Sequence, residues 1–208
     1  MIVLAHRGWW HTKEEQNSAV AIERALAAGY GVETDLRDLA GVIVVSHDPP
    51  RGGELTLDAL LTIAERHPDS GPLALNIKAD GLQMFLEQLL AYRRDYFLFD
   101  MAVPDLVVSI RHGFRCFTRQ SDIEREPVLL DEVDGVWMDS LSATLPDMKA
   151  ATALVEGGKR VAFVSPELHG RAYDEYWAGL RELGLNRSSR TLLCTDFPDL
   201  AAKCLGAE

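Results

Sequence analysis

Residue types that could carry out acid–base, metal-binding and phosphate-binding chemistry lie at the ends of apolar runs in the first part of the chain. In chain order they are His6 and Arg7, Glu33 and Asp35, His47 and Asp48, and Asn76 and Lys78. Such a set is typical of a metal-assisted phosphoryl site, where carboxylates hold a cation, histidines move protons and basic side chains neutralise phosphate oxygens. This chemistry requires a fold that brings the ends of these runs together.

Glu33 and Asp35 are two positions apart in the strand-like segment YGVETDL. On a β-strand that spacing directs both carboxylates to the same face. Two carboxylates side by side repel each other unless a proton or a cation lies between them. We therefore predict a divalent cation with oxygen ligands, Mg²⁺ or Ca²⁺, at this position.

His6 and His47 both follow apolar strand candidates, and we predict that they form an acid–base pair. One histidine would activate the nucleophile or would itself be the nucleophile, and the other would protonate the leaving oxygen. Arg7 and Lys78 are the predicted phosphate contacts, Arg7 through a bidentate guanidinium and Lys78 as a point charge.

The elements that would position these residues alternate along the chain. Apolar runs predict strands at 1–5, 30–36, 42–46, 73–78, 96–99, 114–118, 135–138, 160–164 and 191–194. Amphipathic spacing predicts helices at 18–28, 55–66, 82–92, 104–112, 146–155, 173–183 and 198–205. The run at 42–46 is an extra piece, so eight main strands are predicted.

Strands that alternate with helices predict parallel pairing. Eight such units predict a closed (β/α)8 TIM barrel of the α/β class, or else an open doubly wound sheet. The first strand is not followed by a Gly-rich phosphate fingerprint, which disfavours the open sheet. No Pro-, Gly- or Ser-rich linker interrupts the chain, so we predict a single domain over residues 1–208.

The composition argues against several classes of partner. The 208 residues include 21 Lys and Arg against 32 Asp and Glu, a formal net charge of −11, which disfavours nucleic acid and anionic membranes. No window reaches the ~18 apolar residues of a membrane span, and no signal peptide is recognisable. Cys116, Cys194 and Cys204 lack metal-type spacing, and we expect buried free thiols in a cytoplasmic protein. The oligomeric state is not predictable from these features.

Six short motifs together resemble those of the glycerophosphodiester phosphodiesterase family. They are AHRG at 5–8, QNS at 16–18, ETD at 33–35, HD at 47–48, NIK at 76–78 and TDFPD at 195–199. The resemblance extends over nearly the whole chain and implies a phosphatidylinositol-phosphodiesterase-like TIM barrel. It implies metal-dependent phosphodiester hydrolysis, with the histidines of HRG and HD as the catalytic pair, the ETD carboxylates as metal ligands, and Arg7 and Lys78 as phosphate contacts. A neighbouring substrate hydroxyl would attack phosphorus through a cyclic intermediate.

The sequence departs from the family pattern in three ways. Where the family usually has E-N-T in the first loop and E-I-K on the third strand, this chain has Gln16 and Asn76. The resemblance implies that Asn76 is a metal ligand, but an amide oxygen supplies no charge, so we expect weak metal binding without substrate. The usual insertion of several tens of residues after HD is missing, which predicts a more open site with room for a sugar phosphodiester or a lysolipid headgroup.

The function predicted from the sequence is a metal-dependent phosphodiester hydrolase that acts on a glycerophosphodiester or a related small phosphodiester. Two alternatives remain open. One is a catalytically weakened barrel that binds phosphodiesters or phosphosugars, favoured by Gln16 and Asn76, and the other is a lyase-type enzyme that releases a cyclic phosphate. Four polar residues after later strands could contact substrate or order loops, namely Asp139, Glu167, His169 and Asp196.

Overall fold

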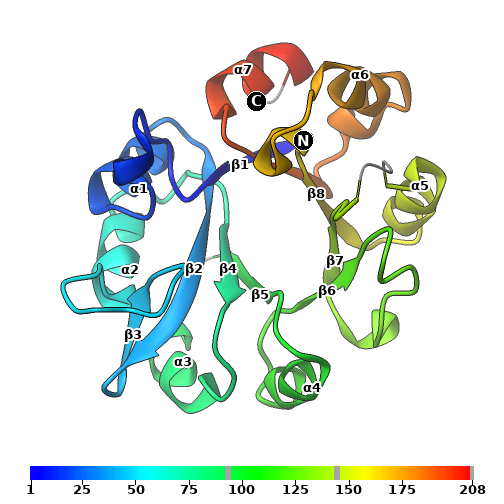
Figure 1. The fold of residues 1–208 in the computed structure, drawn as a ribbon. Coiled ribbons are helices and arrows are strands. Elements are labelled where there is room, and N and C mark those ends of the chain that lie inside the picture. The colour runs from blue at the N-terminus through cyan, green and yellow to red at the C-terminus, as the bar shows by residue number, and fades with distance from the viewer. Residues whose placement is uncertain (92–94, 143–145, 207–208) are drawn as a thin grey trace. The chain divides into compact units, whose positions relative to one another are not determined.

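The structure, a computed structural model, describes residues 1–91, 95–142 and 146–206. Strands and helices alternate along the chain, as predicted (Figure 1). The strands are β1 (Ile2–His6), β2 (Gly31–Leu39), β3 (Val42–Val45), β4 (Leu73–Ile77), β5 (Tyr96–Phe99), β6 (Phe117–Gln120), β7 (Gly135–Met138), β8 (Arg160–Val164) and β9 (Thr191–Thr195). The α-helices are α1 (Ala19–Ala27), α2 (Leu57–Glu65), α3 (Gln83–Leu90), α4 (Val103–Arg111), α5 (Met148–Glu156), α6 (Asp174–Glu182) and α7 (Pro198–Leu205). Short 3-10 helices are η1 (Lys13–Glu15), η2 (Leu130–Glu132), η3 (Pro166–His169) and η4 (Leu185–Arg187).

The chain forms two compact units, which are described separately. The N-terminal unit is Ala5–Cys116, and the C-terminal unit combines Met1–Leu4 with Phe117–Glu208. Strand β1 therefore gives its first residues to the C-terminal unit and its last two to the N-terminal unit. The single domain over residues 1–208 stays a prediction.

In the N-terminal unit, β2 pairs in parallel with β4, and β4 pairs in parallel with β5. After β2 the chain folds back, so that β3 pairs with β2 in the antiparallel direction. The turn is made by Ala40 and Gly41, both with positive φ (51° and 84°), as tight hairpin turns require. The predicted extra strand at 42–46 is therefore the second arm of a β-hairpin.

The helices of the N-terminal unit begin where the sequence supplies a capping side chain. Ser18 accepts a hydrogen bond from the Ala21 N–H at the start of α1, and Thr56 accepts one from the Ala59 N–H at the start of α2. Each cap satisfies a backbone donor that the first helical turn leaves without an intrahelical partner. Helix α1 packs on β2 and on α2, which lies beside it in Figure 1. This packing fixes the loop between β1 and α1 close to β2.

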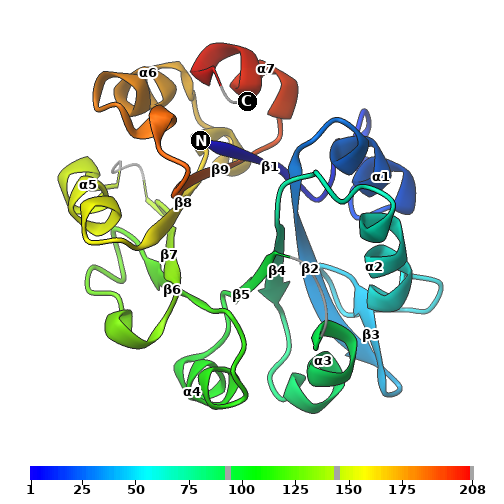
Figure 2. The ribbon, with the colours of Figure 1, turned by 180° about the vertical axis from the view of Figure 1, so that it is seen from behind.

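In the C-terminal unit, β6, β7, β8 and β9 pair in parallel in that order. The middle residues of β7, β8 and β9 are buried, which matches the near-continuous apolar runs expected of parallel strands. Asn186 links the N-terminal residue of this unit to helix α7. Its carbonyl accepts a hydrogen bond from the N-terminal ammonium of Met1 at 2.8 Å, and its side-chain amide donates one to the Leu205 carbonyl at 2.9 Å. Figures 1 and 2 accordingly show the N-terminus beside α7.

Two details correct the sequence predictions, and a third prediction is only partly covered by the structure. The strand predicted at 114–118 is displaced to Phe117–Gln120, because Phe114 is buried in the connection after α4, stacked on His112, rather than in the sheet. Cys204 is exposed on α7, whereas Cys116 and Cys194 are buried as expected, and all three are free thiols. Helix α3 ends at Leu90, and the end of the helix predicted at 82–92 lies outside the described residues.

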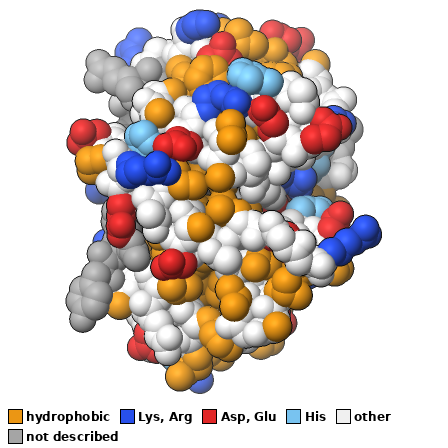
Figure 3. Space-filling model, turned by 90° about the vertical axis from the view of Figure 1, so that its left-hand side faces the viewer, with side chains coloured by type: hydrophobic (Ala, Val, Ile, Leu, Met, Phe, Trp, Pro, Cys, Tyr) orange, Lys and Arg blue, Asp and Glu red, His pale blue; other side chains and the backbone are white. Residues whose placement is uncertain are grey.

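The surface carries charges of both signs. On the side shown in Figure 3, acidic, basic and hydrophobic side chains are interspersed, so basic side chains have acidic neighbours. Within the part of the chain that the structure describes, no helix has the length and apolar character needed to cross a membrane.

Candidate active site

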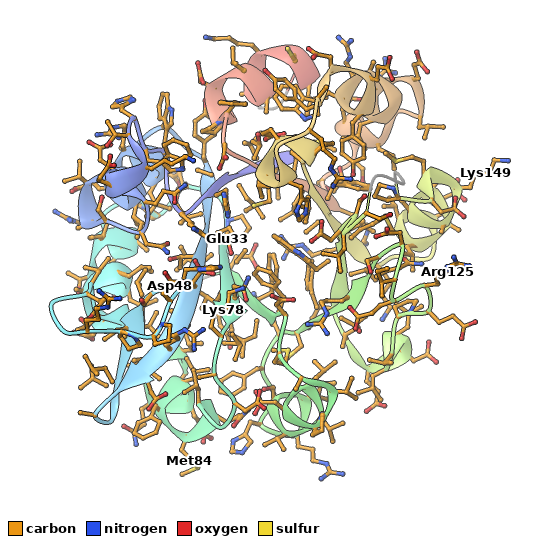
Figure 4. The ribbon with its side chains drawn as sticks, viewed as in Figure 1. Glu33, Asp48, Lys78, Met84, Arg125 and Lys149 are labelled. Atoms are coloured by element: carbon orange, nitrogen blue, oxygen red, sulfur yellow. The ribbon has the colours of Figure 1, made fainter. Side chains whose placement is uncertain are left out.

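The predicted metal ligands lie side by side on two neighbouring strands of the N-terminal unit. Asp35 of β2 is paired in register with Asn76 of β4, and Glu33 precedes Asp35 by two positions. Alternation along a strand therefore places all three side chains on one face. All three are buried, with exposed fractions of 2% for Glu33, 1% for Asp35 and 7% for Asn76. Figure 4 shows Glu33 on β2 and Lys78 directly after the neighbouring β4.

Glu33 is the least satisfied of these groups. Its Oε2 atom is buried and has no hydrogen-bond partner among the described residues. Burial, followed by the nearby charge of Asp35, raises the pKa of Glu33 to about 7, although His6, Arg7 and Lys78 oppose this rise. At neutral pH, and without a cation, a large share of Glu33 is therefore protonated.

Asn76 presents a second buried oxygen to the same place. Its Nδ2 atom donates to Glu33 Oε1 at 3.5 Å, the outer limit of a hydrogen bond. Its Oδ1 atom is buried without a partner among the described residues. Two such oxygens on adjacent strands need an explanation, because buried polar atoms are normally hydrogen-bonded.

Asp35, by contrast, is surrounded by donors. Its Oδ2 atom accepts from Asn17 Nδ2 at 3.0 Å and lies 3.2 Å from Arg7 Nε. Its Oδ1 atom lies 3.6 Å from Lys78 Nζ, which is also 3.3 Å from Asp100 Oδ2. Asp35 is therefore the anion that holds both predicted phosphate contacts, and these two cations would have to turn toward a bound phosphate.

The loop after β1 is built around two residues in the left-handed conformation. Arg7 has a φ of 57° and donates its N–H to the Glu33 carbonyl at 2.9 Å. Asn17 has a φ of 60° and donates its N–H to the Arg7 carbonyl at 2.9 Å, while its Oδ1 atom accepts from Thr34 at 2.7 Å. Between them, Gly8 has no space for a Cβ atom, which would lie 2.7 Å from the Ala21 backbone. These contacts fasten the loop to β2 beside the acidic pair.

Gln16 affects the charge of this loop. Its Oε1 atom accepts from Arg7 Nη1 at 3.3 Å. An amide binds the guanidinium without neutralising it, whereas the Glu of the family pattern would add a negative charge. Arg7 thus keeps more of its positive charge for an anionic ligand.

His6 lies at the end of β1, next to Glu33. The distance between His6 Nε2 and Glu33 Oε2 is 3.9 Å, longer than a hydrogen bond. The His6 carbonyl accepts from the Trp10 indole at 3.1 Å, which orders the backbone that carries the imidazole. The structure therefore joins His6, Arg7 and Lys78 to Glu33, Asp35 and Asn76 in one cluster.

His47 lies after β3 on the wall of a pocket of about 610 Å³ that Arg7 also lines. The backbone before it is tied to β2, because the Ser46 N–H donates to the Asp35 carbonyl at 2.9 Å. About half of the His47 side chain is exposed, and its Nδ1 atom lies 2.9 Å from Asp48 Oδ1. The hydrogen bond and the charge of His47 lower the pKa of Asp48. Because α2 begins soon afterwards, at Leu57, no long segment follows His47 and Asp48.

Two residues of this cluster were missed in the sequence. Asp100 follows β5 and pairs with Lys78. It obeys the rule that located the other residues, a polar side chain at the end of an apolar strand. Asn17 is part of the QNS motif. Its left-handed backbone and its hydrogen bonds to β2 arise only in the folded chain, so the motif is the only sign of its role that the sequence carries.

The residues fit a divalent cation, although weakly. Within the described chain, no group of three or more His, Cys, Asp or Glu residues is arranged to hold a metal ion. Two carboxylates and the Asn76 amide nevertheless form a set of hard oxygen ligands suited to Mg²⁺ or Ca²⁺. The unpartnered oxygens of Glu33 and Asn76 are the observation that supports the fit.

The four unassigned polar residues all lie in the C-terminal unit and are well partnered. Glu167 accepts hydrogen bonds from Ser165, from Thr195 and from the N–H of Asp196. His169 Nε2 lies 2.8 Å from Asp139 Oδ1. These contacts show that loop structure is at least part of their role.

No protein-family model and no curated protein sequence matches the chain. Solved structures, however, resemble it over its full length. A glycerophosphodiester phosphodiesterase from Agrobacterium tumefaciens matches with a TM-score of 0.71 and 20% identity, covering 100% of both chains. An Oleispira antarctica phosphodiesterase, solved in complex with the product sn-glycerol-3-phosphate, matches with a TM-score of 0.71 and 15% identity, covering 100% of this chain and 97% of the other.

The chain has the fold of the glycerophosphodiester phosphodiesterases. The prediction of an α/β fold of the (β/α)8 TIM-barrel class is thereby confirmed, as is the structural resemblance to this family. A Ca²⁺-dependent phosphatidylinositol-specific phospholipase C from Streptomyces antibioticus also matches, with a TM-score of 0.57 and 12% identity, covering 98% of this chain and 95% of the other. At these identities the likeness shows the fold.

Proposed function

We propose that the protein is a metal-dependent phosphodiester hydrolase that acts on a glycerophosphodiester or a related small phosphodiester. The observation that carries the proposal is the pair of unpartnered buried oxygens on Glu33 and Asn76, beside an Asp35 that is paired with Arg7 and Lys78. The arrangement combines a place for a cation with two basic groups for a phosphate. The fold shared with phosphodiesterases supports the proposal.

In this proposal Glu33, Asp35 and Asn76 would hold Mg²⁺ or Ca²⁺. When bound, the cation would offset negative charge on the non-bridging phosphate oxygens. Arg7 and Lys78 would bind the same phosphate, each exchanging part of its contact with Asp35 for a contact with a phosphate oxygen. The oxygens of Asp35 already contact Asn17, Arg7 and Lys78. The affinity for the metal would therefore depend mainly on Glu33 and Asn76, each of which has a buried oxygen without a hydrogen-bond partner among the described residues.

The histidines would move the protons. One takes the proton of the attacking hydroxyl, supplied by the substrate next to the phosphorus, as the new oxygen–phosphorus bond forms. The other donates a proton to the leaving alcohol oxygen as its bond to phosphorus breaks. Water then opens the cyclic phosphate with the two roles exchanged. We place His6 and His47 in these roles because His6 adjoins Glu33 and His47 shares a pocket with Arg7.

The proposed partner is a small molecule. The net charge of −11 disfavours nucleic acid, and the free thiols favour a reducing, cytoplasmic compartment. The short connection after His47 supports an open site that accepts a bulky alcohol group.

A second candidate is a protein that binds phosphodiesters or phosphosugars without rapid turnover. The amide at Asn76 favours it, because the buried ligand set then contains two carboxylates instead of three. Both candidates require the same residues for binding and differ only in turnover.

The test is a panel of glycerophosphodiesters and bis(p-nitrophenyl) phosphate, incubated with Mg²⁺, with Ca²⁺ and with a chelator. Turnover that the chelator abolishes supports the hydrolase. Saturable binding without turnover supports the second candidate, and neither binding nor turnover contradicts both. Phosphorus NMR of the products shows whether a cyclic phosphate accumulates, which would indicate a lyase instead.

A further inference from the structure

We propose that a cavity in the C-terminal unit binds a neutral polyhydroxylated ligand, such as a sugar or a cyclitol. The cavity has a volume of about 480 Å³ and is lined by the last residues of β6 and β7, by described residues that follow these strands, and by Pro146 and Asp147 before α5. Its size lies within the range of small-molecule sites. Its lining residues belong to the C-terminal unit, whereas the residues of the proposed hydrolase site belong to the N-terminal unit.

Two residues that carry hydrogen-bond acceptors, Gln120 and Asp139, lie at adjacent strand ends and line this cavity. Gln120 ends β6, and its Oε1 atom is buried without a partner among the described residues. Its Nε2 atom donates to the Arg125 carbonyl at 2.9 Å, which fixes which end of the amide is the acceptor. Asp139 follows β7, and its N–H donates to the Gln120 carbonyl at 2.9 Å. A buried acceptor without a donor costs about 1–3 kcal/mol, so a ligand that donates to Gln120 would be stabilised.

The wall that carries Asp139 is held in place by its neighbours. Asp139 Oδ1 accepts from the Ser140 N–H at 2.6 Å and lies 2.8 Å from His169 Nε2. Arg171 donates to the Ser140 hydroxyl at 3.0 Å and to the Ser140 and Ser142 carbonyls. Because these contacts exist without a ligand, binding would need little reorganisation of the wall.

The other charged residues of the lining are partly used. Asp122 accepts the N–H groups of Leu141 and Ser142 at 2.7 and 2.9 Å. Asp147 accepts two N–H groups at the start of α5. Arg125, labelled in Figure 4 in the segment after β6, adds guanidinium donors to the lining. The cavity thus offers both acceptors and donors.

This combination favours hydroxyl groups over other ligand chemistry. A hydroxyl donates and accepts without carrying a charge, whereas an ammonium group only donates and an inorganic phosphate carries negative charge and mainly accepts. Three Asp residues against one Arg give the lining a net negative charge, which disfavours an anion. Met138, Ile123 and Pro146 supply apolar surface for the C–H groups of a ring. A neutral polyol therefore matches the lining better than an amine or an inorganic anion does.

The experiment uses the full chain with ¹³C-labelled methionine methyl groups, observed by NMR without added divalent cations. Met138 lines the cavity, and Met84, exposed on α3 of the other unit, is the internal reference. myo-Inositol, D-glucose, ethanolamine and inorganic phosphate are titrated separately. The proposal predicts a saturable shift of the Met138 signal with at least one of the two polyols and a constant Met84 signal. A saturable shift with ethanolamine or phosphate alone, or with none of the four, overturns it.

Variants test whether Gln120 is the acceptor. Gln120→Met keeps the length of the side chain but removes the acceptor, and should weaken polyol binding about tenfold. Gln88→Met makes the same change on α3 and should leave the affinity unchanged. If Gln120→Met does not fold, Ile123→Glu at an exposed lining position should weaken binding about threefold. If a folded variant, Gln120→Met or Ile123→Glu, binds the polyol with wild-type affinity, the proposal is contradicted. Metal-dependent turnover of phosphodiesters is measured separately, so the proposed function can fail or hold independently of this result.

Discussion

Glu33 and Glu167 illustrate two different uses of a carboxylate in a sheet of parallel strands. Glu167, after β8, accepts hydrogen bonds from Ser165, Thr195 and the N–H of Asp196. Glu33, on β2, has one buried oxygen without a partner among the described residues, and its pKa is raised to about 7 by burial and by Asp35. The sequence marks both positions by the same pattern, an acidic residue at the end of an apolar run.

The difference teaches that hydrogen-bond satisfaction, rather than residue type, separates a structural carboxylate from a candidate ligand. Glu167 joins the chain after β8 to the end of β9, and both of its oxygens accept hydrogen bonds from the protein. The Oε2 atom of Glu33 has no hydrogen-bond donor among the described residues, so a proton or a cation would complete its environment. The predictions below test this contrast, beginning with the largest expected effect.

His6→Ala should lower kcat/KM for a phosphodiester by about 10²–10⁴-fold, because an acid–base group beside Glu33 is lost. The matched control is His112→Ala, at a histidine of the same unit that pairs with Glu87 and stacks on Phe114. Steady-state kinetics should show wild-type values for the control. If His6→Ala had the same kcat/KM as the wild type, the proposal that this cluster catalyses the reaction would be wrong.

Glu167→Ala should lower the free energy of unfolding by about 2–4 kcal/mol, measured by urea denaturation. The loss arises because the buried Ser165 and Thr195 hydroxyls lose their acceptor. Glu33→Gln, studied without metal at pH 8, should be neutral or stabilising because it removes a buried charge. If Glu33→Gln were as destabilising as Glu167→Ala, the contrast between the two carboxylates would be wrong.

The metal-free protein should lose stability as the pH rises from about 4.5 to about 7. In this window Glu33 is ionised in the unfolded chain but still protonated in the folded one, where its pKa is raised to about 7. The folded state then binds more protons, so the free energy of unfolding falls with pH, by up to about 3 kcal/mol. Urea denaturation across this range should show the slope in the wild type, a flatter profile in Glu33→Gln, and a flatter profile with excess Ca²⁺. An identical slope in Glu33→Gln would mean that another group titrates.

Asn76→Asp should strengthen Mg²⁺ or Ca²⁺ binding roughly tenfold, because it adds a carboxylate at the amide position. Isothermal titration calorimetry measures both proteins, and the wild type should bind more weakly than micromolar. Asn186→Asp, at an amide in the C-terminal unit, is a control that should leave the affinity unchanged. Sub-micromolar binding by the wild type would contradict the account of Asn76.

The sequence was a good guide to the fold and to part of the site. Apolar runs located most of the strands, because parallel strands are buried on both faces, and helical spacing located the helices, which are buried on one face. The spacing of Glu33 and Asp35 predicted their common face, and the structure places Asn76 beside them.

Other features depend on contacts that no local pattern encodes. The hydrogen bonds of Asn17 to Asp35 and Thr34 arise from the folding of the β1–α1 loop onto β2. The displaced strand β6 reflects the burial of Phe114 outside the sheet, where an apolar residue gives the same signal as a strand residue. The pairing of Asp139 with His169 links positions 30 residues apart, beyond the range of periodicity arguments.

The central claim is that Glu33 and Asn76 form an incomplete cation site. Its most direct test is a crystal structure of the protein soaked with Mn²⁺ and a phosphate analogue, with anomalous data to locate the ion. The account predicts an anomalous peak within about 2.0–2.6 Å of Glu33 Oε2 and Asn76 Oδ1, with the phosphate near Arg7 and Lys78. Bound phosphate analogue without an ion at these oxygens, or an ion held only elsewhere, would contradict it.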